Sequence, residues 1–199
     1  LPYYAECVHK GYAGVYQYDA SAQVWYQLGD IIRNASHTYD NLFGRSVHMT
    51  ADGNRVAIVD THFDGNQGYY ELWDYNSSTN SWGLADYSWG HKDNSYWGNK
   101  GSALSGVGNI FAAGNQHTAD YKILYRYYNG TSWSGLIQVG QSYSYAPSFN
   151  YDGTRISFIN STVLRVYERP HAFSTSWSQI FAVSVPEMGG DSEQQNTAL

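Results

Sequence analysis

The sequence predicts an all-β fold built from repeated four-stranded antiparallel sheets, and three observations lead to this prediction. First, the 199 residues include 20 Tyr, 7 Trp and 20 Gly but only 4 Pro, a composition that favours strands joined by turns. Second, charged residues make up only 14%, whereas a helical bundle is rich in Ala, Leu, Glu and Lys. Third, the chain is similar to itself, with a tryptophan recurring roughly every 50 residues.

Three segments repeat the same order of features, and an incomplete copy precedes them. The partial unit covers residues 1–30, and the full units cover about residues 43–85, 100–136 and 145–180. Each unit ends in a tryptophan that follows a polar loop; these are Trp25, Trp82, Trp133 and Trp177. A period of roughly 50 residues fits one four-stranded blade, so residues 1–185 are expected to form a β-propeller of about four blades.

Within each unit, the first two strands are expected to meet at a tight turn. Asp52-Gly53 and Asp152-Gly153 stand between apolar stretches, and Asp-Gly is a strong hairpin signal because tight hairpin turns need positive φ. The nearly continuous apolar run Val56–Val59 suits a strand that is covered on both faces. The closing tryptophan is expected to anchor an outer strand against the neighbouring blade.

The incomplete first unit leaves two ways to finish the ring. The segment Ile180–Val185 can supply the missing strand and close the propeller by pairing the two ends of the chain. Alternatively, the ring is open, and its exposed edges pair with another subunit. Residues 186–199 are polar and are expected to be a flexible tail or a docking arm.

Three stretches carry a resemblance to a known family. Residues 25–30 (WYQLGD), 43–58 (FGRSVHMTADGNRVAI) and 70–75 (YELWDY) are similar to FG-GAP-like β-propeller repeats of secreted and cell-surface proteins. The resemblance extends over about residues 12–180. It implies a propeller, an extracellular location and a role in adhesion or protein interaction, and it does not imply an enzyme.

Other features also favour a secreted or cell-surface glycoprotein. The chain begins at Leu1, which suggests a processed chain or a fragment, and it holds four glycosylation sequons, at Asn34, Asn76, Asn129 and Asn160. With Cys7 as its one cysteine it has no internal disulfide. A net charge of -6 argues against nucleic acid as a partner, and no apolar run approaches the roughly 20 residues of a membrane span.

A weak calcium loop is the nearest approach to a metal site. Asp60, Asp64 and Glu71, with Gly65 between them, fall at the spacing of an oxygen-ligand loop. His62 stands where Asp or Asn is wanted, and Glu71 lies in a predicted strand, so an ordinary loop is the default and no other cofactor is expected.

Aromatic residues in the longer connections are the candidate ligand contacts. They gather where the units join, and exposed rings there can stack on sugars or anchor a protein partner, although packing between blades is the alternative role. These residues are Tyr87, Trp89, Tyr96, Trp97, Tyr143 and Tyr145. The histidines show no metal-ligand spacing, and His48 is expected to be a satisfied core or interface residue.

These features predict a non-catalytic extracellular protein that presents surfaces for adhesion or self-assembly. Its partners are expected to be other copies of itself, other surface proteins or glycans. The alternative is a carbohydrate-binding, lectin-like propeller. A glycoside-cleaving enzyme ranks lower, because the carboxylates Glu71 and Glu168 look like ordinary strand residues.

Overall fold

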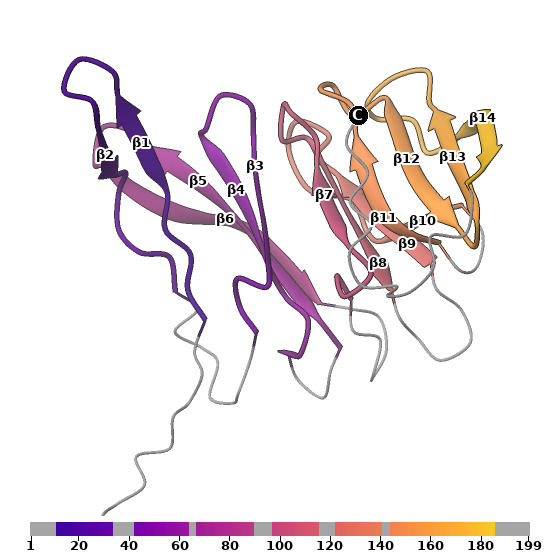
Figure 1. The fold of residues 1–199 in the computed structure, drawn as a ribbon, viewed down its shortest axis with the longest axis horizontal. Helices are drawn as coiled ribbons and strands as arrows, with labels where there is room; N and C mark the ends of the chain where they lie inside the picture. Colours follow the sequence, from indigo (N-terminus) through magenta and orange to yellow (C-terminus); the bar gives the residue numbers. More distant parts are fainter. Residues whose placement is uncertain are drawn as a thin grey trace, which may run out of the picture.

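The computed structural model describes residues 11–33, 42–63, 67–89, 97–115, 122–140 and 144–185. In these ranges the chain forms one two-stranded and three four-stranded sheets, so the predicted all-β fold of four-stranded antiparallel sheets is confirmed. The sheets stand side by side in chain order, like an opened fan (Figure 1). No helix in the described ranges is long and apolar enough to cross a membrane.

Each sheet is a simple meander of neighbouring strands. The N-terminal hairpin pairs β1 (Tyr16–Asp19) with β2 (Val24–Gln27). Sheet I contains β3 (Ser46–Met49), β4 (Arg55–Asp60), β5 (Tyr69–Asn76) and β6 (Ser81–Trp89). Sheet II contains β7 (Ser102–Leu104), β8 (Ile110–Asn115), β9 (Lys122–Tyr127) and β10 (Ile137–Val139). Sheet III contains β11 (Ser144–Phe149), β12 (Arg155–Asn160), β13 (Val163–Glu168) and β14 (Ser178–Ser184).

The C-terminal strand does not close the ring. β14 pairs with β13 and so completes sheet III, and within the described part of the chain it forms no pairing with β1 or β2. One of the two predicted alternatives was closure of the ring by pairing the two ends of the chain. The described strands do not form this pairing. The reason is local: the connection from β13 covers only residues 169–177, so pairing β14 with β13 closes a short loop and costs less chain entropy than pairing it with the distant β1 or β2.

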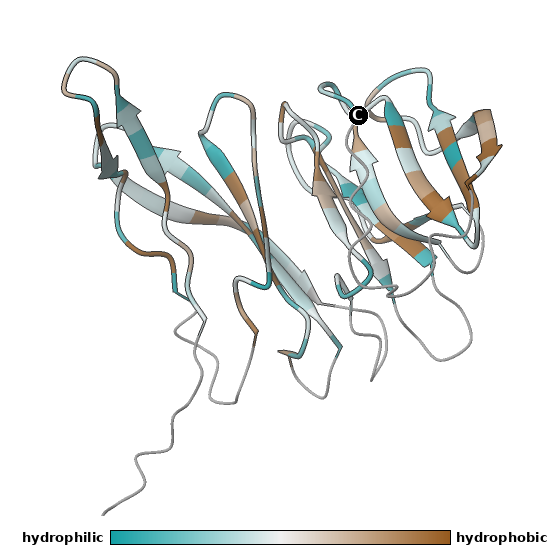
Figure 2. Cartoon of the chain, viewed as in Figure 1, coloured by the Kyte–Doolittle hydropathy of each residue, from teal (hydrophilic) through white to brown (hydrophobic). Residues whose placement is uncertain are grey.

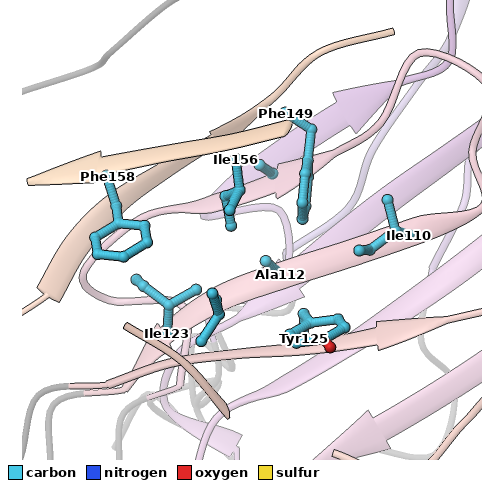
Figure 3. Packing of buried hydrophobic residues seen from close by; sticks show 9 residues of the cluster. Ile110, Ala112, Ile123, Tyr125, Phe149, Ile156 and Phe158 are labelled. Carbon is cyan, nitrogen blue, oxygen red and sulfur yellow. The ribbon is translucent and has the colours of Figure 1, made fainter. Parts of the chain in front are cut away.

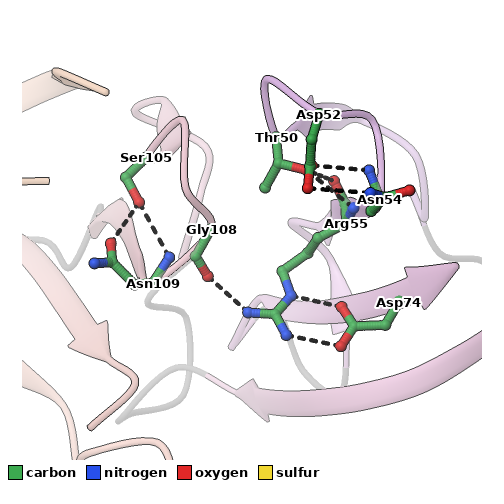
Figure 4. A network of polar contacts seen from close by, with 8 residues as sticks. All are labelled: Thr50, Asp52, Asn54, Arg55, Asp74, Ser105, Gly108 and Asn109. Atoms are coloured by element: carbon green, nitrogen blue, oxygen red, sulfur yellow. Dashed lines mark hydrogen bonds and ion pairs between the residues drawn. The ribbon is translucent and has the colours of Figure 1, made fainter. Parts of the chain in front are cut away.

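Side chains fix the predicted tight turns between the first and second strands. Asp52 Oδ1 accepts hydrogen bonds from Thr50 Oγ1 at 2.6 Å and from the Asn54 backbone N at 3.0 Å, and Gly53 adopts φ +75° (Figure 4). Asp152 makes the same kind of contacts with Thr154, next to Gly153 at φ +72°. The Asp-Gly hairpins expected from the sequence are thus formed, because Asp satisfies the turn backbone and Gly accepts the positive φ.

The core consists of three seams between successive sheets. Hydrophobic residues run along β4 and β12 (Figure 2). The second strands β4 and β8 are buried on both faces because one face meets the preceding unit and the other meets the following sheet. At the second seam Tyr70 of sheet I stacks on Phe111 of sheet II, with ring centroids 4.3 Å apart. At the third, Ile110 and Tyr125 of sheet II face Ile156 and Phe158 of sheet III (Figure 3).

The closing tryptophans pack onto a neighbouring unit, as the sequence predicted, and in each case this is the preceding unit. Trp82 donates from Nε1 to the Leu28 carbonyl at 2.8 Å, which joins sheet I to the N-terminal hairpin. The Arg55 guanidinium of sheet I lies over the Trp133 ring at 5.9 Å. Trp177 meets Tyr125 of sheet II edge to face at 5.7 Å. A tryptophan at the same repeat position therefore contacts the preceding unit at each of the three seams.

Arginines add directional links across the second seam. Arg55 forms a bidentate pair with Asp74, with nitrogen–oxygen distances of 2.5 and 2.7 Å, and donates from Nη1 to the Gly108 carbonyl of sheet II at 2.7 Å (Figure 4). Arg126 of sheet II donates to Asp86 at 2.8 Å and to the Tyr70 hydroxyl at 2.9 Å. Such charge-assisted bonds fix how one sheet is rotated against the next.

We predict that Phe111→Ala destabilises the chain by about 3–5 kcal/mol, because it removes a fully buried ring from a seam and leaves a cavity. Urea unfolding followed by tryptophan fluorescence measures the change. Phe173→Ala is the matched control, because Phe173 is exposed, and it is expected to cost less than about 1 kcal/mol. Equal losses in the two variants would contradict the assignment of Phe111 to a core seam.

Candidate functional site

The first strands of the three sheets come together, and they carry the main polar cluster of the described residues. β3 lies next to β7, and β7 lies next to β11, so these strands form the inner side of the fan. Each begins with a serine: Ser46, Ser102 and Ser144. Their convergence places polar side chains of one sheet beside those of the next.

Ser46, His48 and Ser102 form a compact triangle across the second seam. His48 Nε2 lies 3.0 Å from Ser46 Oγ and 2.8 Å from Ser102 Oγ, and the two hydroxyl oxygens are 2.9 Å apart. Ser46 and His48 are two residues apart on β3, so strand alternation turns both toward sheet II. Ser102 is buried, whereas Ser46 is partly exposed.

The environment of His48 keeps its imidazole neutral at ordinary pH. Desolvation by burial lowers the pKa of His48 from 6.5 to about 4. A neutral imidazole nitrogen beside a hydroxyl can take up the proton of that hydroxyl, as in nucleophilic hydrolysis of esters. The triangle thus holds the two groups that ester cleavage needs, a base and a hydroxyl within hydrogen-bond distance.

The sequence pattern did not single out this cluster. His48 was expected to be a satisfied core or interface residue, and it lies at the interface between two sheets. Ser46 and Ser102 begin the first strands of successive repeats, and Ser46 lies two residues before His48. This equivalence was present in the sequence but was not used. Aligning the repeats by their inner strands brings all three residues together.

A second polar group lies on the face of sheet I that is turned away from sheet II. Glu71 accepts hydrogen bonds from Tyr69 Oη at 3.0 Å and Trp73 Nε1 at 2.8 Å, and burial raises the pKa of its carboxyl. Asp60, fully buried nearby, accepts from the backbone N of Leu42 and of His62, each at 3.0 Å. Both carboxylates accept hydrogen bonds from groups of the protein itself, which indicates a structural role for them.

The predicted calcium loop remains a prediction. Asp60 and Glu71 belong to the group just described, but Asp64 lies outside the described residues. In the described ranges no three His, Cys, Asp or Glu side chains gather into a metal-binding group. Glu71 also lies in a strand, with its oxygens directed at Tyr69 and Trp73.

The candidate aromatic ligand contacts separate into different environments. Trp97 is only 1% exposed, donates from Nε1 to the Ala113 carbonyl at 3.1 Å and meets Tyr70 edge to face, so it belongs to the second seam and cannot stack on a sugar. Tyr87 is exposed. Tyr145 is partly buried and donates to the Ser161 carbonyl at 2.5 Å. Tyr96, Tyr143 and the side chain of Trp89 lie outside the described part.

The sequons also differ in accessibility. Asn76 and Asn129 stand in exposed turns, where their Oδ1 atoms accept backbone hydrogen bonds from Ser78 and Thr131 at 2.9 Å. Asn160 is 9% exposed and its Nδ2 points to Ser144 Oγ at 3.4 Å, which leaves no room for a glycan in the folded chain. Asn34 is outside the described residues.

No family model matches the sequence, and no curated protein matches it. Solved structures do resemble the chain: a protein from Lactobacillus plantarum (TM-score 0.54, 14% identity), a putative 6-phosphogluconolactonase from Bacteroides uniformis (0.58, 14%) and a periplasmic gluconolactonase from Pseudomonas aeruginosa (0.56, 13%). They cover 87%, 87% and 92% of this chain, which spans 50%, 49% and 52% of theirs. These neighbours are β-propellers, and the chain has a β-propeller fold.

The comparisons correct the functional part of the sequence prediction. The chain was expected not to be an enzyme and to serve as a non-catalytic structural or adhesive protein. Two of the three neighbours are named as lactonases, so this fold does not argue against catalysis, and that expectation is wrong. The carbohydrate-binding alternative and the glycoside-cleaving alternative are no better supported. The error arose because function was inferred from a repeat motif. Such a motif determines the blades but not the chemistry of a site between them.

We predict that His48 makes the fold acid-sensitive. Since its pKa is about 4 in the folded chain and 6.5 when solvated, the unfolded chain binds a proton in this interval that the folded chain does not. The contribution is complete above pH 6.5 and is lost as the pH falls toward 4. Between pH 7 and pH 5 the free energy of unfolding is expected to drop by about 2 kcal/mol more in the parent chain than in His48→Gln.

Urea titrations of both proteins at pH 7, 6 and 5 measure this difference. The other titrating groups are shared, so they cancel in the comparison. Parallel pH curves for the two proteins would contradict a buried neutral His48.

Proposed function

We propose that this chain acts on cyclic esters of sugar acids, with His48 as general base and Ser46 as the hydroxyl that it activates. The observation that carries the proposal is His48 Nε2 lying 3.0 Å from Ser46 Oγ, on the inner strands of the propeller. Supporting it, two solved proteins of similar fold are named as a gluconolactonase and a putative 6-phosphogluconolactonase. Because the chain spans about half their length, the activity is proposed from its own residues.

The chemistry follows from the roles of the three side chains. The Ser46 oxygen bonds to the lactone carbonyl carbon while His48 Nε2 takes the hydroxyl proton. The ring C–O bond then breaks, and its oxygen receives that proton from the imidazolium. Water, deprotonated by the same nitrogen, releases the hydroxy acid from Ser46, so that one water is consumed. Ser102, 2.8 Å from Nε2 and 2.9 Å from Ser46 Oγ, positions both groups.

A lactone suits a base of this kind. The low pKa of His48 keeps the nitrogen free of a proton throughout the neutral range, but it also makes the base weak. A lactone carbonyl is more electrophilic than an ordinary amide carbonyl, and its ring oxygen leaves more readily than the nitrogen of an amide. The balance favours an activated cyclic ester over a peptide bond as substrate.

His48→Gln is expected to lower kcat/KM for glucono-1,5-lactone by about 100-fold or more, because a positioned general base contributes at least that factor. Ser46→Ala is expected to fall comparably. Proton release in weak buffer, with spontaneous hydrolysis subtracted, measures the rate, and the 6-phosphate of the lactone is assayed in parallel. In the parent chain the acid limb of kcat/KM is expected below pH 5 instead of near 6.5.

Ser148→Ala is the matched control, because Ser148 lies on inner strand β11 but outside the triangle. Its activity should equal that of the parent. A parent chain that hydrolyses neither lactone faster than buffer, or a His48→Gln variant at full rate, would refute the assignment.

We also propose that the protein acts outside the cell and that its repeats are of the FG-GAP-like type. Exposed sequons at Asn76 and Asn129 support this location, and one neighbour is named as periplasmic.

Expression through a eukaryotic secretory pathway is expected to add glycans at Asn76 and Asn129 and none at Asn160, whose side chain is buried. Gel mobility before and after glycosidase treatment reads this out. Asn76→Gln and Asn129→Gln should each remove one mobility step, while Asn160→Gln should remove none. A glycan mapped to Asn160 by mass spectrometry would contradict the burial argument.

A further inference from the structure

Arg169 occupies a position at which the other two four-stranded sheets have a tyrosine. At the end of the third strand, the backbone N of Tyr75, Tyr128 and Arg169 donates to the carbonyl of the residue that precedes the second strand, at 2.9, 2.8 and 2.9 Å. The three positions are therefore equivalent in sheets I, II and III. Each side chain also lies against the closing tryptophan of its own sheet. Sheet III alone places a cation at this position.

In sheet I the polar groups of this pair of positions have protein partners. Tyr75 Oη and Trp82 Nε1 each donate a hydrogen bond to a group of the protein, at 2.9 and 2.8 Å. In sheet III the corresponding atoms, Arg169 Nη2 and Trp177 Nε1, are buried and have no hydrogen-bond partner among the described residues. The substitution of an arginine for a tyrosine thus leaves two buried donors unpaired.

Tyr125 of sheet II adds a third unpaired polar atom, because its Oη is also buried without a partner in the described ranges. The guanidinium carbon of Arg169 lies 4.8 Å from the ring centroid of Trp177 and 6.0 Å from that of Tyr125, and the two rings are 5.7 Å apart. Burial raises the pKa of Tyr125, and the Trp177 N–H and the Arg169 charge oppose this rise, so both groups lie near its hydroxyl. The three groups therefore lie together across the third seam.

The guanidinium of Arg169 is held in place and its charge is not neutralised. Nε donates to the Gly153 carbonyl at 2.9 Å and Nη1 to the Ser174 carbonyl at 3.3 Å, which leaves Nη2 without an acceptor. The side chain is 1% exposed, and within the described part of the chain it forms no ion pair. The charge of Asp152 acts on it from a distance, but the Asp152 carboxylate is bonded to the backbone N and hydroxyl of Thr154.

We propose that a chloride ion is bound at the third seam by Arg169 Nη2, Trp177 Nε1 and Tyr125 Oη. A halide accepts hydrogen bonds from all three groups and neutralises the buried cation, which is costly to leave unpaired. A water molecule suits the site less well, because Arg and Trp nitrogens only donate and the two protons of the water would need acceptors of their own. The donors are fully buried, which favours a monatomic ion over an organic anion.

Such an ion joins two sheets, because Tyr125 belongs to β9 of sheet II whereas Arg169 and Trp177 flank the connection between β13 and β14 of sheet III. A ligand that binds only the folded chain stabilises it in proportion to the logarithm of the ligand concentration. Chloride is therefore expected to stabilise the fold. None of the three residues belongs to the triangle around His48, so this proposal is tested independently of lactone hydrolysis.

Urea unfolding of the 199-residue chain, followed by circular dichroism, measures the effect of chloride. Methanesulfonate, whose anion is too large for the site, keeps the ionic strength constant. Raising chloride from about 1 to about 100 mM is expected to raise the ratio of folded to unfolded chain about 10-fold, which corresponds to a Kd of about 10 mM. Arg169→Met should abolish this dependence. Arg155→Met is the matched control, because Arg155 lies in the same sheet and pairs with Glu168 at the surface, and it should keep the full dependence.

Two milder variants test the other donors and replace Arg169→Met if it does not fold. Tyr125→Phe and Trp177→Phe each remove one donor and keep a ring, and each is expected to weaken chloride binding about 5-fold. Crystals grown in sodium bromide should show an anomalous peak beside Arg169 Nη2. A parent chain whose stability does not depend on chloride, an equal dependence in Arg169→Met, or a water molecule in place of bromide would overturn the proposal.

Discussion

Face-to-face packing between successive sheets is the constraint on which this molecule depends. Each sheet is a small meander that buries no core of its own, and the second strands of sheets I and II are covered because a neighbouring unit lies on each side. Hydrophobic attraction is not directional, so aromatic and arginine contacts set the angle. The stacked rings of Tyr70 and Phe111, and the bond from Arg55 to the Gly108 carbonyl, fix sheet I against sheet II.

The same constraint explains where polar chemistry can occur. Packing the sheets as a fan brings the inner strands together while the outer strands spread apart. A residue on an inner strand therefore meets residues of the next repeat, and Ser46, His48 and Ser102 are held from two sheets without a dedicated loop. Burial at the seam desolvates the imidazole, so the packing that stabilises the fold also lowers the pKa of His48.

Arg169 is the reverse case at the third seam. It is buried with no carboxylate partner in the described residues, it donates to the Gly153 carbonyl at 2.9 Å, and its guanidinium lies 4.8 Å from the Trp177 ring centroid. Burial lowers the pKa of Arg169 to about 10, which leaves it charged at neutral pH. Carbonyl groups and an aromatic face replace the water that the cation loses.

Repetition made the fold predictable, and it also limited the prediction of the site. Asp-Gly turns, apolar second strands and closing tryptophans recur because the seams need them, so the sequence predicted the strands and the packing of Trp82, Trp133 and Trp177 against a neighbouring blade, although not which neighbour. Trp97 shows the limit: its sequence surroundings suggest an exposed loop, yet it fills the second seam, because burial depends on a sheet roughly 15 residues further along the chain. His48 and Ser102 are 54 positions apart, and only the register of the sheets joins them.

Trp25 and Trp82 occupy equivalent positions in their units but differ in burial. A tryptophan favours burial of its ring with its N–H hydrogen-bonded, and for Trp82 in sheet I the preceding unit provides both. The hairpin holds Trp25 in the same geometry with Tyr18 although no described residue covers the pair. The residue type and its place in the hairpin thus repeat along the chain while burial does not, so the burial of each tryptophan depends on the unit packed against it and not on its own hairpin. Comparison with Trp82, which contacts the Leu28 carbonyl of the preceding unit, therefore shows what packs against a tryptophan at this position when a preceding unit is present.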